Sequence, residues 1–86
     1  MSRAEAIALL FCAKYVLADL GQTDAAGVAE DEENRLRDGV SREDLAEIAS
    51  SLVKPGKRGR IFKVLYPPQY VRAVCFIAAV LRAVDD

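Results

Sequence analysis

Residues 2–21 read SRAEAIALLFCAKYVLADLG, and this stretch decides the fold class. Ser2 and Glu5 stand in the spacing of a capping box, in which each side chain satisfies a backbone N–H that the first helical turn leaves open. The glycine that ends the stretch stands where helices usually stop. We therefore predict a helix from Arg3 to about Leu20.

This first helix is apolar around most of its circumference. At 100° per residue, Leu9 and Val16 fall on one face, while Ile7, Phe11 and Tyr15 fall on another. A helix of this kind has to be covered on more than one side. We therefore expect it to pack centrally, together with the last helix of the chain.

Two later segments also carry helical signals. Ser41 is an N-cap residue, and Leu45, Ile48, Ala49 and Leu52 follow it at the spacing of one apolar stripe. The last helix begins at Pro68, because proline suits a first helical turn, and reaches about Val84. Its predicted core face consists of Tyr70, Val74, Ile77, Leu81 and Val84.

Between the first and second of these helices, the apolar pattern thins. We predict that residues 22–40 are a connector containing a short solvated helix, supported by the i,i+4 pairs Asp31–Arg35 and Glu33–Arg37. The acidic run from Glu30 to Glu33 is then a solvated face, because it lacks the spaced, turn-forming loop of a calcium site.

The chain is long enough for one domain, and 52% of its residues are apolar, so it can fold. We predict an all-α fold: a single helical domain over residues 1–86, with three long helices and one or two short ones. Residues 61–66 can be read as a strand or as a short helix. We favour the helix, because a lone strand would have no pairing partner in an otherwise helical chain.

Basic residues gather in the last third of the chain. Residues 1–53 hold five basic and eleven acidic side chains, whereas residues 54–86 hold seven basic and two acidic ones. The run from Lys54 to Arg72 contains no acid, and its glycines let the backbone approach a partner closely. Such a surface neutralises phosphates, and aromatic side chains beside it can stack on unpaired bases. We predict a nucleic-acid interface, for DNA or RNA with little sequence preference, formed by Lys54, Lys57, Arg58, Arg60, Lys63, Tyr66 and Arg72.

Two other interpretations stay open. The positive charges of the basic loop can balance the negative charges of the protein's own acidic segment, or they can simply keep the loop in contact with solvent. Alternatively, the protein is an interaction module or small regulatory subunit that docks on a protein partner through its apolar terminal helices. The small residues Cys75, Ala79 and Ala83 form a seam that suits either an internal helix contact or a subunit interface, and we expect a homodimer.

Cys12 and Cys75 lie within apolar runs. We expect them to be reduced core residues of a cytoplasmic protein, because free cysteine is among the most buried residue types. A redox-active or bridged pair is the alternative. A membrane span needs roughly 18 to 20 continuous apolar residues, and no segment approaches this length, so we expect no membrane association.

The chain contains no histidine, which excludes histidine-based triads and imidazole metal ligands. We expect no enzymatic activity, no metal and no cofactor. The stretch from Ser41 to Ala49 resembles the first helix of a helix-turn-helix. Pro55, Gly56 and Gly59 then fall where the turn and the recognition helix should be, so no base-contacting role is assigned.

Overall fold

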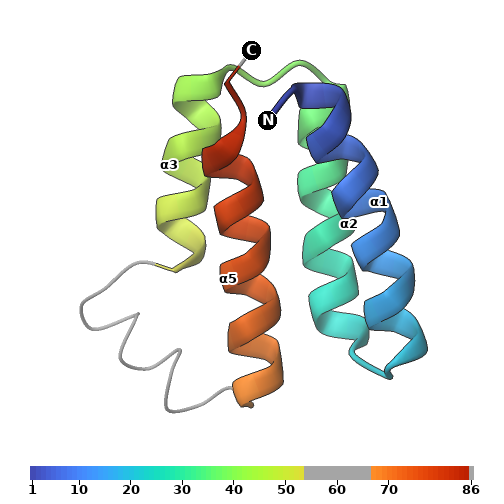
Figure 1. The fold of residues 1–86 in the computed structure, drawn as a ribbon. Coiled ribbons are helices and arrows are strands. Elements are labelled where there is room, and N and C mark those ends of the chain that lie inside the picture. Colours follow the sequence, from blue (N-terminus) through green and yellow to red (C-terminus); the bar gives the residue numbers. More distant parts are fainter. Residues whose placement is uncertain (54–66, 86) are drawn as a thin grey trace.

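The computed structural model describes residues 1–53 and 67–85, and every regular element in these residues is a helix. The helices are α1 (Arg3–Asp19), α2 (Thr23–Arg37), α3 (Arg42–Leu52) and α5 (Pro68–Ala83) (Figure 1). The all-α prediction is therefore confirmed. The choice between strand and helix for residues 61–66 lies outside the described residues.

The helices form two antiparallel pairs. α1 packs against α2 and α3 packs against α5, while α5 also contacts α2 and joins the two pairs (Figure 1). The contact between α1 and α5 is much smaller. The last helix is thus central as predicted, but the central position predicted for the first helix is wrong, because α1 lies at the outer edge beside α2.

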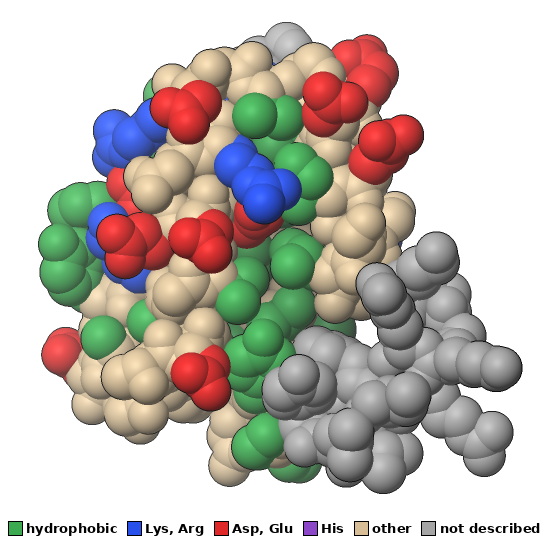
Figure 2. All heavy atoms as spheres, turned by 180° about the vertical axis from the view of Figure 1, so that it is seen from behind, with side chains coloured by type: hydrophobic (Ala, Val, Ile, Leu, Met, Phe, Trp, Pro, Cys, Tyr) green, Lys and Arg blue, Asp and Glu red, His purple; other side chains and the backbone are tan. Residues whose placement is uncertain are grey.

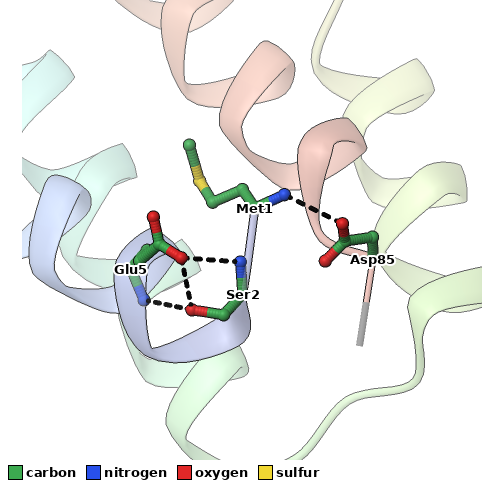
Figure 3. Close-up of polar contacts among 4 residues, drawn as sticks. All are labelled: Met1, Ser2, Glu5 and Asp85. Carbon is green, nitrogen blue, oxygen red and sulfur yellow. Dashed lines mark hydrogen bonds and ion pairs between the residues drawn. The ribbon is translucent and has the colours of Figure 1, made fainter.

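Local capping explains where α1 and α3 begin. The backbone N–H of Glu5 donates to Ser2 Oγ at 3.1 Å, and the N–H of Ser2 donates to Glu5 Oε1 at 3.3 Å (Figure 3). Ser41 Oγ accepts the N–H of Asp44 at 3.2 Å in the same way. At the other end of α1, Gly21 adopts a φ of 79°, which lets the chain turn directly into α2.

The segment predicted as a connector is instead a full helix. α2 has 15 residues, and Ala25, Ala29 and Leu36 are buried on its inner side. Ala25 and Ala29 are one helical turn apart, and their small side chains allow α1 and α2 to approach closely. α2 therefore depends on packing against another helix, which its low mean hydropathy does not reveal.

The core lies between the two pairs, and α5 contributes more residues to it than any other described helix. The predicted core face of α5 is confirmed for Val74, Ile77, Leu81 and Val84, which are all buried, whereas Tyr70 is only half-buried. The predicted stripe of α3 is confirmed as well: Leu45 and Ala49 are buried, and Ile48 and Leu52 pack partly buried against the same core.

The acidic run is only partly a solvated face. Glu32 and Glu33 are buried, with 2% and 3% of their surface exposed. They face inward because this side of α2 packs on its neighbours, where Lys14 of α1 meets Glu33. Arg37 pairs with Glu33 as predicted, at 2.8 Å, but Arg35 pairs with Glu32 at 3.1 Å.

Candidate functional site

α1 leaves much of its apolar surface uncovered. Only Ala6 and Leu10 of this helix are fully buried. Large apolar side chains that remain exposed in the described residues are Leu9, Phe11, Tyr15, Val16 and Leu20 on or just after α1, and Phe76 on α5. Among the described helices, α2 covers one side of α1 and α5 touches it only slightly, so these helices do not supply the coverage on several sides that the sequence predicts.

A groove of about 540 Å³ opens between α1 and α5. Its apolar lining consists of Leu9, Cys12, Ala13, Val16, Leu17, Ala73 and Phe76. Three polar side chains, Gln22, Gln69 and Arg72, line it as well. They come from the turn that follows α1 and from the first turns of α5, so the polar groups lie at one end of the groove and its middle is apolar.

An exposed row of side chains on α1, the α1 outer stripe, borders this groove. It consists of Glu5, Ala8, Cys12, Tyr15 and Asp19, all of which are exposed. These positions alternate in steps of three and four, which places them along one side of the helix. The stripe therefore carries an acid at each end and apolar or weakly polar groups between them.

A matching row on α5, the α5 outer stripe, consists of Arg72, Cys75, Ala79 and Arg82. All four are exposed and are again spaced by steps of three and four. The predicted seam of Cys75, Ala79 and Ala83 is also exposed. In this chain, the seam is therefore not a contact between described helices, and its role as a subunit interface stays a prediction. We call the two outer stripes and the groove between them the α1–α5 face.

The charges at the ends of the two stripes are opposite in sign. Asp19 and Arg72 make no ion pair within the described part of the chain, and Arg82 makes only a 3.5 Å hydrogen bond from Nη2 to Ser50 Oγ. Glu5 uses Oε1 for the capping bonds, and these hydrogen bonds from Ser2 lower the pKa of its carboxyl. All four groups are exposed, so the α1 outer stripe ends in carboxyl groups and the α5 outer stripe ends in guanidinium groups.

Two aromatic rings at the edge of this face contact the ammonium group of Lys14. Phe11 and Tyr15 pack edge to face with ring centroids 5.1 Å apart. Lys14 Nζ lies 5.0 Å and 5.4 Å from the two centroids, and its ion pair with Glu33 of α2 measures 2.8 Å. The hydrogen bond to Glu33 raises the pKa of Lys14. The ammonium thus stays charged and orders both rings through cation–π attraction.

Both cysteines are exposed free thiols. The prediction that they are core residues is therefore wrong. Cys12 lines the groove, and Cys75 belongs to the α5 outer stripe. They lie in apolar stretches of sequence, but on the sides of α1 and α5 that no other described helix covers.

Of the seven predicted nucleic-acid contacts, Arg72 lies within the described residues, where it is exposed at the polar end of the groove. The other six, from Lys54 to Tyr66, lie outside them. The nucleic-acid interface formed by these seven residues therefore stays a prediction.

The opposite side of the molecule carries both hydrophobic and charged side chains. In Figure 2, a band of hydrophobic side chains runs down the middle of this side, with acidic and basic groups around it. A hollow of about 330 Å³ lies between α2 and α3 and is lined by Glu32, Arg35, Glu47, Ile48, Ser51 and Leu52. Two of its charged groups, Glu32 and Arg35, already pair with each other. The α1–α5 face is therefore the better candidate site.

Comparisons with protein-family models, with curated proteins and with solved structures found no significant match to this chain. Within the described residues, no helix combines the length and the hydrophobicity that a membrane crossing requires. A functional conclusion therefore depends on the geometry of the α1–α5 face and on the charge pattern of the sequence.

Proposed function

We propose that this protein is a helical protein-interaction module that docks through its α1–α5 face. One observation carries the proposal: three of the six large apolar side chains exposed in the described residues, Leu9, Val16 and Phe76, line the same groove between α1 and α5. Soluble monomers rarely expose contiguous apolar patches of this kind, and larger ones mark interaction sites. Burying these side chains in an interface would remove apolar surface from water, which favours association.

The shape and chemistry of the face favour a helical partner. The backbone groups of α1 and α5 are bonded within their own helices, so the face offers no strand edge for pairing. Instead, it presents two parallel rows at helical spacing with a groove between them, which suits the apolar side of another helix. Acidic groups at the ends of one row and basic groups at the ends of the other would fix how that partner lies.

Nucleic-acid binding is the second candidate. It is supported by the acid-free run from Lys54 to Arg72 and by the exposure of Arg72. It ranks second because residues 1–53 carry an excess of acidic side chains, which repel phosphates. The two functions differ in their response to salt, since phosphate binding weakens steeply with salt and apolar contacts do not.

The test compares the apparent size of the protein in extracts of the cells that produce it, after nuclease treatment and at low and high salt. Val16→Glu and Phe76→Glu place a charge in the groove, whereas Ala46→Glu places one on an exposed position of α3 and is the matched control. We expect the wild type and the control to migrate well above 9.4 kDa at both salt concentrations, and the groove variants to migrate near it.

Two outcomes would contradict the proposal. In one, the wild-type protein in the extract already migrates at the size of a monomer. In the other, nuclease or high salt alone reduces the assembly to that size, which would favour nucleic-acid binding instead.

A further inference from the structure

α1 and α5 lie antiparallel, and the start of each helix lies near the end of the other. We use height for the position of a residue along the common direction of the two helix axes. At one end, the N–H of Asp85, just after α5, donates to the carbonyl oxygen of Met1 at 3.0 Å, and the Met1 amine lies 3.1 Å from Asp85 Oδ2 (Figure 3). At the other end, Leu20 and Gln69 line one hollow of about 370 Å³. Cys12 and Cys75, near the middles of the two helices, therefore lie at about the same height on the α1–α5 face.

A second copy of the chain can cover this face in two symmetric ways. Two-fold symmetric contacts bring the same patch of both subunits together. If the two-fold axis runs parallel to the helices, α1 lies against α5 of the partner subunit. If the axis runs across the helices, α1 lies against α1 of the partner subunit, and α5 against α5.

The end charges of the outer stripes distinguish these arrangements. With the axis across the helices, Glu5 opposes Asp19 of the partner subunit and Arg72 opposes Arg82 of the partner subunit, so like charges meet. With the axis parallel to the helices, both acids of α1 oppose both arginines of the partner's α5. Like-charge juxtaposition opposes association, whereas opposite charges favour it and fix the register.

We infer that the α1–α5 face is covered by a second copy of this chain, with α1 antiparallel to α5 of the partner subunit. This inference rests on the proposed function and names its partner. The positions along the helix axes agree. Glu5 lies seven residues, or about 10 Å, from Cys12, and Arg82 lies the same distance from Cys75, toward the same end of the two helices. Asp19 and Arg72 differ in height by about one helical turn, which an arginine side chain spans.

The apolar groups of the face complete the fit. Ala79 and Ala83 are small and exposed, so a helix can approach α5 closely. Leu9 and Val16 on one side of the groove, with Phe76 on the other, then lose their exposed surface to the partner subunit. The steps of three and four residues along both outer stripes are those of helices packed side by side.

The native cysteines test the arrangement directly. The inferred dimer brings Cys12 of each subunit close to Cys75 of the partner subunit. We expect a short bismaleimide to cross-link the purified wild-type protein into a covalent dimer, and Cys12→Ser and Cys75→Ser each to lose that product. A mixture of the two variants should recover it, because one remaining Cys12 then meets one remaining Cys75.

The same experiment can overturn the inference. If Cys75→Ser alone cross-links as well as the wild type, Cys12 faces Cys12 and the axis runs across the helices. Sedimentation equilibrium of the purified protein gives the second measurement: we expect about twice 9.4 kDa for the wild type and for Ala46→Glu, and the monomer mass for Val16→Glu.

Failure of this inference can be distinguished from failure of the proposed function. If the purified protein is a monomer but migrates as a larger assembly in the extract, the partner is another protein, so the inference is wrong and the proposed function stands. If the protein is a monomer in both settings, both are wrong.

Discussion

Lys14 Nζ on α1 lies 2.8 Å from Oε1 of Glu33 on α2, and this contact joins two helices whose facing surfaces are otherwise largely apolar. Arg37 donates from Nε to the other oxygen of the same carboxylate, also at 2.8 Å. Glu33 is therefore buried between two cations from different helices. Lys14 in turn supports Phe11 and Tyr15 at the edge of the α1–α5 face, so a buried ion pair orders an exposed surface.

We expect Glu33→Gln to destabilise the fold at pH 7 by about 1 kcal/mol, because Lys14 and Arg37 lose their charge partner while solvent screens part of the effect. The hydrogen bond from Lys14, with that from Arg37, lowers the pKa of Glu33. The stabilisation is therefore present above the ordinary carboxyl pKa and lost as pH falls through the lowered one.

Urea denaturation of the wild type and Glu33→Gln at pH 7 and at pH 3 measures this difference. The gap between the two proteins should shrink at pH 3. Asp31→Asn is the matched control, because Asp31 is an exposed acid on the same helix. An equal loss of stability in the control would contradict the assignment to the buried pair.

Glu32 should behave in the opposite way. Burial raises the pKa of its carboxyl, against the lowering effect of Arg35. Its Oε2 is buried and has no hydrogen-bond partner within the described residues. A carboxyl whose pKa is raised in the folded state stabilises the fold at pH values below its ordinary pKa. This stabilisation is lost as the pH rises through the pKa of the folded state. We therefore expect Glu32→Gln to leave the free energy of unfolding at pH 7 unchanged or to increase it. As the pH falls toward 5, the stability of the wild type should increase relative to that of the variant in the same denaturation assay. A clear loss of stability in Glu32→Gln at pH 7 would refute this.

Local signals made much of the fold predictable. Ser2, Ser41 and Pro68 mark the starts of three helices within a few residues of sequence, and the stripes of α3 and α5 face the core as their periodicity indicates. The full length of α2 is not predictable from local signals, because this helix is stabilised by contacts with residues far away in the sequence. Leu36 is the only large apolar residue among its buried residues; the others are alanines, Glu32 and Glu33, and the charge partner Lys14 of Glu33 lies on another helix.

The candidate site was predictable only in part. The apolar character of α1 and the small-residue seam of α5 are visible in the sequence. Which sides of these helices stay uncovered depends on how many neighbours each has, and this is a property of the tertiary structure. Cys12 was assigned to the core because residues around it are apolar, yet it lines an open groove.

The basic loop predicted from the sequence can be tested independently of the α1–α5 face. If Lys57, Arg58 and Arg60 contact phosphates, changing all three to Ala removes three counterion-releasing contacts. The slope of log affinity against log salt should then fall by roughly two to three units, while the melting temperature changes little. A mobility shift with single- and double-stranded DNA and RNA at two salt concentrations measures this. A lower melting temperature with an unchanged salt slope would show that the loop balances the protein's own acids instead.

Charge reversal at Asp19 and Arg72 tests which helices meet in the dimer. Asp19→Arg should weaken dimerisation about three- to tenfold, because an exposed ion pair contributes up to about 1 kcal/mol and reversal adds repulsion from Arg72 of the partner subunit. Arg72→Asp should weaken it similarly. The double variant restores opposite charges in the pairing of α1 with the partner's α5, so its dissociation constant should return toward that of the wild type.

With α1 against α1 instead, Asp19 faces Glu5 of the partner subunit, and Asp19→Arg alone would strengthen the dimer. Sedimentation equilibrium of the four proteins at low salt distinguishes these outcomes, and the differences should shrink at high salt because exposed charges are screened. Both positions are exposed and make no ion pair within the described part of the chain, so the single variants should fold like the wild type. Additive losses in the double variant would mean that Asp19 and Arg72 do not meet across the interface.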